Sequence, residues 1–264
     1  MSETREQRHN YHLIGSFTRY SGWTARVETV LEYFGIPYTV QFITYKEISR
    51  VSPSGLVPLL EYHTKDRSIQ INDTLAICEF LAESNPELNL WPRDQLLRAI
   101  ARSAAAEMHS GFLTLRNTFH TNFVAHFSGN IPISEQAMKE IERLLALWDN
   151  ARRFTKARLA EINEKDGGFL FGEYSIADAF FWPVLWRFRT YNLPLDRAST
   201  DVLAWIEKMW NDPVMQRLAH HYYRQEELPE SRIEKYDDVF KGQEGIYSGR
   251  FPENWRFSLS EPAP

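Results

Sequence analysis

The sequence predicts an α/β domain followed by an all-helical domain, and three observations lead to this prediction. Residues 11–84 alternate between short apolar segments and helical patterns, in the order β-α-β, a connecting segment, then β-β-α. A segment with two prolines, NPELNLWPRDQ (85–95), separates this part from the rest. Beyond it the apolar residues repeat every three or four positions, as in amphipathic helices, and no strand pattern is visible.

The α/β domain can be assigned element by element. Val27, Val30, Leu31 and Phe34 share one face of a helix, and Gly35 is its expected C-terminal stop. The strands joined through this helix should be parallel, with a right-handed crossover, and the next two strands are close enough for a hairpin. This order predicts a mixed four-stranded sheet of thioredoxin-like topology. The expected elements are a strand at 11–18, a helix at 24–35, a strand at 38–43, strands at 58–62 and 67–71, and a helix at 73–83.

The helical domain is expected to begin with one long amphipathic helix from Gln95 to Phe123. Ser134 can cap a second helix, and Ser175 with Asp178 forms a capping box at the start of a third. The third helix is unusually apolar, so we expect it to be central. The charged, turn-rich C-terminal part predicts an irregular tail that wraps over the body. The expected ranges are 175–189 for the third helix, 200–210 and 213–222 for two shorter helices, 1–93 for the α/β domain, 94–225 for the helical domain and 226–264 for the tail.

Composition and charge narrow the classes of function. The formal net charge is −5, so nothing attracts a phosphate backbone and no nucleic-acid partner is expected. The single cysteine, Cys78, excludes a disulfide within the chain and argues against a thiolate metal site, so no metal is expected. The first ten residues are polar, and no apolar run approaches the roughly 20 residues that span a bilayer. A soluble, cytoplasmic protein without a membrane partner is therefore expected.

Four motifs of this sequence resemble motifs of the cytosolic glutathione transferase superfamily. They occur in the same order along the chain and at the same spacing as in that superfamily. The turn YSGWTAR (20–26) is similar to the serine-containing turn of the serine-type and zeta-like classes. The resemblance covers roughly residues 11–222 and implies a thioredoxin-like glutathione-binding domain, a helical substrate-binding domain and a homodimer. The other motifs are SPSGLVPLL (52–60) with INDTLAICEFLAE (71–83), AEMHSGF (106–112) with the Leu-Arg pair 115–116, and GEYSIAD (172–178).

This resemblance implies glutathione as the co-substrate and Ser21 as the hydroxyl that activates its thiol. A free thiol has a pKa of about 8.5, and one pKa unit corresponds to about 1.4 kcal/mol. A hydrogen bond to a charged group contributes about 1.5–3 kcal/mol, so one hydroxyl and a helix N-terminus can lower the thiol pKa by about one to two units. Tyr20 is the main rival for this role, and Thr18 and Thr24 are the others. Alternatively, Ser21 only caps the helix.

Five further residues are implied in glutathione binding. Trp23 lies beside the activating serine. A cis Pro58 would turn the Val57 backbone towards a peptide-like ligand, although X-Pro bonds are more often trans. Asp73 and Thr74 stand at a helix N-terminus. There they can cap the helix, bind the ammonium and carboxylate of the γ-glutamyl group, or do both.

The residue that holds the glycyl carboxylate of glutathione stays open. The family often has a polar residue at or near the position that Leu56 occupies here. Tyr45, Lys46 or Arg50 could take its place, and the sequence does not distinguish them.

Three residues are candidates for the pocket of the second substrate. Met108 and Phe112 fall on the helix that should run past the groove, but they suit the helical core as well. Arg116 lies one turn beyond Phe112 and can hold an anionic group or form an exposed ion pair.

The resulting hypothesis is a glutathione S-transferase, in which the thiolate attacks an electrophilic, largely apolar substrate. A glutathione-dependent cis/trans isomerase of a conjugated double bond, as in zeta-like relatives, is the first alternative. The second is a glutathione-transferase-like binding module without catalysis, because a fold does not determine a function.

Overall fold

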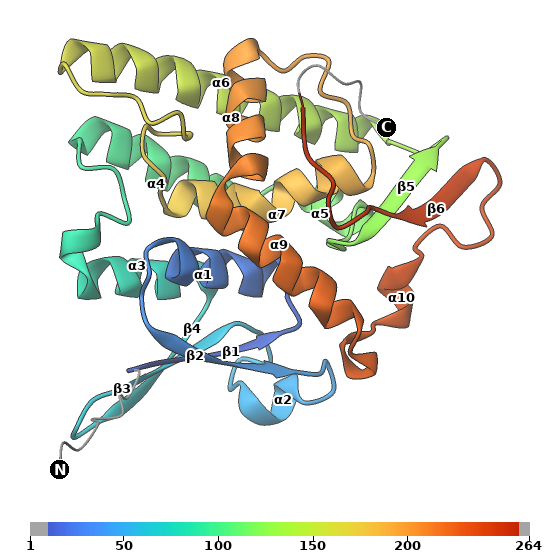
Figure 1. Cartoon of the computed structure of the whole chain (residues 1–264), viewed down its shortest axis with the longest axis horizontal. Coiled ribbons are helices and arrows are strands. Elements are labelled where there is room, and N and C mark those ends of the chain that lie inside the picture. The colour runs from blue at the N-terminus through green and yellow to red at the C-terminus, as the bar shows by residue number, and fades with distance from the viewer. Residues whose placement is uncertain (1–9, 259–264) are drawn as a thin grey trace.

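The N-terminal part of the protein is a sheet with helices packed against it. The computed structural model describes residues 10–258. The sheet lies below α1 and α3 in Figure 1, and α4, α6, α7 and α8 lie above them. The elements are β1 (Tyr11–Ser16), α1 (Gly22–Tyr33), β2 (Tyr38–Ile43), α2 (Ile48–Val51), β3 (Leu59–His63), β4 (Ser68–Asn72) and α3 (Thr74–Ser84).

The sheet has the predicted thioredoxin-like topology. Its strand order is β2-β1-β3-β4. β1 and β2 are parallel, and β3 pairs antiparallel with both β1 and β4. The expected parallel pair and the expected hairpin are therefore confirmed. The bond between Val57 and Pro58 is cis, as the resemblance implied.

The rest of the chain is mainly helical, and its most apolar helix is central. Every residue of α7 except Arg189 is buried, and α7 packs against both α1 and α4. The Asp178 carboxylate accepts hydrogen bonds from the backbone N–H groups of Ser175 and Leu170, which confirms the predicted capping box. The elements are η1 (Pro86–Leu88), α4 (Gln95–Ser110), α5 (Leu113–Thr118), α6 (Glu135–Glu161), α7 (Ile176–Thr190), α8 (Thr200–Asn211) and α9 (Pro213–Glu226).

The prediction of one continuous helix from Gln95 to Phe123 was wrong. The helix ends at Ser110, and Phe112 has a left-handed backbone conformation with φ 55°. A short helix, α5, then begins in a new direction. Its first N–H groups have no partners within the helix, and the Glu140 carboxylate of α6 accepts two of them. This cap comes from a distant segment, so periodicity alone could not reveal the break.

The expectation of no strand after residue 95 was also wrong. β5 (Ala125–Gly129) pairs antiparallel with β6 (Ile246–Arg250). Each strand has only five residues, and the two lie more than a hundred residues apart in the sequence. Neither is recognisable without its partner, because a short alternating pattern is a weak signal by itself.

The segment after α9 folds back along the helical part, as Figure 1 shows in red. It contains η2 (Pro229–Ser231), α10 (Glu234–Asp237) and β6. Phe240 and Phe251 of this segment are buried. Within residues 10–258 no helix is both long and apolar enough to cross a bilayer.

Candidate active site

A cavity of about 290 Å3 lies where the sheet domain meets the helical part. Ser21 and Trp23 reach it from the start of α1, and Arg116 reaches it from α5. The segment around α2 and the C-terminal segment supply the other walls. The lining residues are Ser16, Tyr20, Ser21, Gly22, Trp23, Arg26, Tyr45, Ile48, Gly55, Leu56, Val57, Arg116, Asn117, His120, Thr121, Arg187, Ile233 and Tyr236.

Ser21 is the N-cap of α1, and its hydroxyl is well placed to donate a hydrogen bond. Its Oγ accepts a hydrogen bond from the Thr24 backbone N–H at 3.2 Å and lies 2.9 Å from the Thr24 hydroxyl. If the Thr24 hydroxyl is the donor, both lone pairs of the Ser21 oxygen are occupied. The Ser21 hydrogen is then left to point elsewhere, and the positive end of the helix dipole lies at the same place.

Of the three rival hydroxyls, one is bonded to a carboxylate and two are buried away from the cavity. The Tyr20 hydroxyl donates a hydrogen bond to Asp237 and also lies beside the Arg19 guanidinium. Burial and this hydrogen bond raise the pKa of the phenol, so it stays protonated. Thr18 and Thr24 are fully buried and do not line the cavity.

The loop before β3 forms one side of the cavity. Val57 lines it, whereas Pro58 is buried and does not. Of the three candidates for the glycyl carboxylate, only Tyr45 lines the cavity; Lys46 and Arg50 do not. The exposed Leu56 lies on the same rim.

Asp73 and Thr74 lie at the N-terminus of α3, beyond Trp23. One Asp73 oxygen accepts the backbone N–H groups of Leu75 and Ala76, so Asp73 caps α3 as expected. Its other oxygen lies 3.2 Å from Nε2 of His109. The buried Thr74 donates a hydrogen bond to the carbonyl of Trp23. The two residues are not among those that line the cavity, but Trp23 connects them to it.

Three arginines that line the cavity have no carboxylate partner in the described part of the chain. Within residues 10–258, Arg26, Arg116 and Arg187 form hydrogen bonds to carbonyl and hydroxyl oxygens but no ion pair. Nη1 of Arg26 is buried without any hydrogen-bond partner. Burial lowers the pKa of all three, and that of Arg187 falls to about 10. Buried positive charges without counterions favour an anionic ligand.

The two apolar candidates for the substrate pocket lie elsewhere. Met108 is fully buried and Phe112 is 6% exposed, and neither lines the cavity. Both pack in the main core, which is the alternative that the sequence left open for them. Arg116 is the member of the predicted set that faces the cavity.

The sequence did not indicate that Arg187, Ile233 and Tyr236 line the cavity. An arginine within the very apolar helix α7 was a usable signal, because buried charges are rarely retained without a role. Ile233 and Tyr236 carried no such signal. They belong to a segment whose position depends entirely on tertiary contacts.

Other candidate chemistry is absent from the described residues. Cys78 is buried, and burial raises the pKa of its thiol, so it is not activated as a nucleophile. No group of three or more histidine, cysteine, aspartate or glutamate side chains in residues 10–258 could hold a metal ion.

The fold and the cavity define a class of protein: a thioredoxin-like domain joined to a helical domain, with the cavity where the two meet. Comparison with known families agrees with this class. The family model "Glutathione S-transferase, N-terminal domain" matches residues 20–84, and "Glutathione S-transferase, C-terminal domain" matches residues 131–208. Together they match more than half of the chain. The protein belongs to the glutathione S-transferase family.

Three similar proteins illustrate the range of relatives. A maleylacetoacetate isomerase from Dictyostelium discoideum is 32% identical over 124 residues, 42% of this chain and 55% of that protein, so the match spans about half of the relative. A glutathione transferase homologue from Burkholderia with bound glutathione has a TM-score of 0.58 at 23% identity and covers 81% of this chain and 98% of its own. A maleylacetoacetate isomerase from Anaeromyxobacter dehalogenans has a TM-score of 0.57 at 24% identity, with 85% and 96% covered. The two structures establish the shared fold alone.

Proposed function

We propose that this protein binds glutathione in the cavity at Ser21 and uses the Ser21 hydroxyl to hold the sulfur as a thiolate. The thiolate then attacks an electrophilic second substrate in the same cavity. The observation that carries the proposal is the position of Ser21, which lines the cavity at the N-terminus of α1. Ser21 acts by stabilising charge, and the cavity acts by bringing the two reactants together.

A hydrogen bond from Ser21 and the N-terminus of α1 can together stabilise the thiolate enough to form it near neutral pH. A hydrogen bond to an anion contributes about 1.5–3 kcal/mol, and a helix N-terminus adds about 0.3–1 kcal/mol. Together these lower a thiol pKa of about 8.5 by roughly one to three units, to neutrality or below. No protein thiol is required, since Cys78 is buried.

Glutathione would extend from Ser21 in two directions. Its γ-glutamyl group would lie beyond Trp23 at the N-terminus of α3, where Asp73 supplies a half-exposed carboxylate. Its cysteinyl backbone would pair with Val57, and Tyr45 stands on the rim where the glycyl carboxylate would end. Met108 and Phe112 would then support this site only from the core behind it.

Exchange of Asp73 for asparagine is expected to weaken glutathione binding about 10-fold, because a charge-assisted bond to the ammonium group is lost. Asparagine still caps a helix and tolerates the φ of 74° at this position. Calorimetric titration with glutathione measures the effect. The matched control is Asp94→Asn at the N-cap of α4, which should leave glutathione binding unchanged. Equal affinity in wild type and D73N would leave Asp73 with a capping role only.

The direct test of the function combines binding with turnover. We expect retention on immobilised glutathione and consumption of thiol with a general electrophile such as 1-chloro-2,4-dinitrobenzene. Retention without turnover of any electrophile would instead favour a non-catalytic binding module. Failure to bind glutathione would refute both.

The proposal extends to assembly and location. Members of this family commonly act as homodimers in the cytoplasm, and we propose the same arrangement here. Light scattering coupled to gel filtration should give twice the chain mass of 31.0 kDa. A monomer at micromolar concentration would contradict this part of the proposal without affecting the site.

A second candidate function is favoured by the three unpaired arginines. An electrophile with an acidic group would be attracted to Arg116 and Arg187. If the thiolate adds to a conjugated double bond of such an acid, the bond can rotate before glutathione leaves. The result is cis/trans isomerisation, in which glutathione is regenerated. Recovery of a geometric isomer with catalytic glutathione supports isomerisation, and stoichiometric consumption of thiol supports conjugation.

Exchange of Arg116 for glutamine is expected to reduce kcat/KM for an acidic enone about 10-fold, because a charge-assisted hydrogen bond is removed. The neutral ester of the same enone should change less than about 3-fold, since it offers no full charge to the guanidinium. Arg102→Gln, at an exposed arginine paired with Glu79, is the matched control. An equal loss for acid and ester would show that Arg116 only supports the structure.

A further inference from the structure

The C-terminal segment forms a wall of the cavity, although it lies outside both ranges that match the family. Those ranges end at residue 208, and the segment follows α9, which ends at Glu226. Ile233 and Tyr236 of this segment line the cavity that contains Ser21. This wall therefore lies in a part of the chain that neither family model matches.

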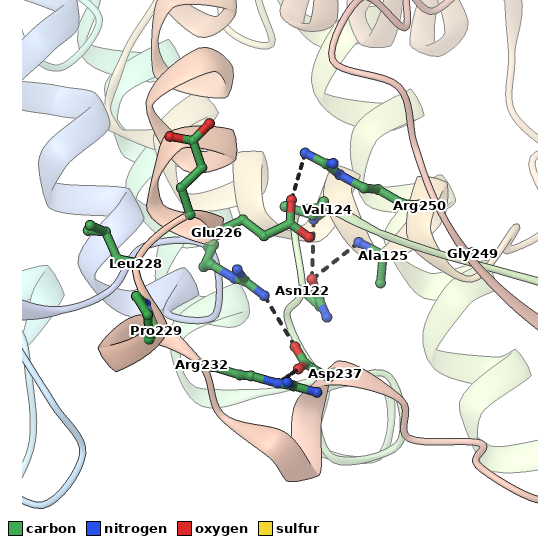
Figure 2. Close-up of a pocket in the computed structure, with 12 residues that line it drawn as sticks. Asn122, Val124, Ala125, Glu226, Leu228, Pro229, Arg232, Asp237, Gly249 and Arg250 are labelled. Atoms are coloured by element: carbon green, nitrogen blue, oxygen red, sulfur yellow. Dashed lines mark hydrogen bonds and ion pairs between the residues drawn. The ribbon is translucent and has the colours of Figure 1, made fainter.

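The wall is held in place by a cluster of charges, shown in Figure 2. Asp237 accepts hydrogen bonds from Arg232, at 2.5 Å, and from Arg19, at 3.2 Å. The hydroxyl of Tyr20 donates to the same carboxylate. Arg19 is only 4% exposed, so its bond to Asp237 is shielded from solvent on one side. The C-terminal segment is thus joined directly to the two residues that precede Ser21.

A second set of contacts fixes the segment from the other side. The carbonyl of Tyr236 accepts a hydrogen bond from the Asn122 side chain at 2.9 Å. The backbone N–H of Phe251 donates to the carbonyl of Val124, next to the pairing of β5 with β6. The first of these contacts fixes the backbone of Tyr236 beside the cavity, and the second fixes the end of the segment.

The ring of Tyr236 belongs to a small aromatic group. Its centroid lies 4.8 Å from the His120 ring and 6.2 Å from the Tyr20 ring. All three residues line the cavity. Val57 and Gly55, by contrast, come from the loop before β3, where glutathione is expected. The aromatic group therefore faces the part of the cavity that glutathione leaves for the electrophile.

We infer that Tyr236 determines substrate specificity, and that it selects electrophiles with a flat aromatic or conjugated group, which its ring contacts directly. The inference rests on the proposed function, because it assumes that the sulfur of glutathione lies at Ser21. Flat unsaturated groups gain from contact with aromatic rings beyond the area that they bury. Asp237 is a positioning residue for Tyr236, since it holds the segment without lining the cavity.

Binding of glutathione conjugates tests this inference without requiring turnover. Wild type should bind S-(p-nitrobenzyl)glutathione more tightly than glutathione. Tyr236→Ala should lose about 5- to 10-fold of that preference, the size expected for lost aromatic contacts, while its affinity for glutathione stays within 2-fold. Tyr236→Phe should retain the preference, because the ring and not the hydroxyl makes the contact. Tyr247→Ala, at a 70% exposed tyrosine of the same segment, is the matched control.

The outcomes separate the two proposals. If Tyr236→Ala retains the full preference, or loses affinity for glutathione itself to the same extent, the role of Tyr236 is refuted and the proposed function stands. If wild type binds neither ligand, the proposed function fails and this inference fails with it. Kinetic data add a third criterion: kcat/KM should fall for an aromatic electrophile and stay within about 2-fold for iodoacetamide, which has no ring to contact.

Discussion

Exchange of Ser21 for alanine is expected to lower turnover about 10- to 100-fold, the rate equivalent of one hydrogen bond to a charged sulfur. The affinity for glutathione should change less than about 3-fold, because most of the binding groups lie elsewhere on the ligand. The thiol pKa of bound glutathione should rise towards that of the free tripeptide. Ultraviolet titration of the thiolate in the binary complex measures that pKa directly.

Controls for this experiment follow from the local structure. Ser21 also caps α1, and its loss to alanine costs about 0.5–2 kcal/mol of stability. Glycine at an N-cap costs only a few tenths of a kcal/mol, so Ser21→Gly separates catalysis from folding. Tyr20→Phe removes the rival hydroxyl and should retain turnover. Full activity in both Ser21 variants, with loss in Tyr20→Phe, would transfer the role to Tyr20.

The buried carboxyl of Glu28 should make the free energy of unfolding depend strongly on pH. This α1 residue is 2% exposed, and burial together with the charge of Glu32 raises its pKa to about 8. The hydroxyls of Thr18 and Tyr222 offset part of that rise. The His221 ring lies 3.8 Å from the Glu28 carboxylate, and burial lowers the pKa of that ring, so it adds little positive charge near neutral pH.

The sign of the pH dependence follows from these shifts. Between the unfolded pKa of about 4.3 and the folded value, the native state binds more protons at Glu28 than the unfolded chain does. The contribution of Glu28 to stability is therefore greatest at low pH and is lost as the pH rises from about 4.3 to 8. The maximum slope is about 1.4 kcal/mol per pH unit.

Glu28→Gln should remove this dependence, because the amide does not ionise. Relative to wild type, the variant should gain about 3 kcal/mol in free energy of unfolding between pH 5 and pH 8. Urea denaturation at the two pH values measures the change, and Glu83→Gln, at an exposed glutamate of α3, is the control. A constant difference between wild type and Glu28→Gln would mean that Glu28 is already ionised at pH 5.

The sequence predicted the N-terminal part of this protein well because its elements carry local signals. The face shared by Val27, Val30 and Leu31 identified α1, and the intervening helix required β1 and β2 to be parallel. The helical part was harder. The break after α4 depends on Glu140 of α6, and the pairing of β5 with β6 depends on a partner far along the chain.

The same distinction applies to the site. Ser21, Trp23 and Val57 belong to recognisable motifs, and the structure places all three on one cavity. The wall that contains Tyr236 has no sequence signal, because its place depends on an ion pair between Arg19 and Asp237. Such contacts join segments more than two hundred residues apart, and no local pattern encodes them.

A crystal structure of the complex with glutathione tests the central claim most directly. We predict that the glutathione sulfur lies within hydrogen-bonding distance of the Ser21 Oγ, with the γ-glutamyl group at Asp73 and Thr74. A sulfur atom that lies far from Ser21, or beside another hydroxyl, would contradict the account.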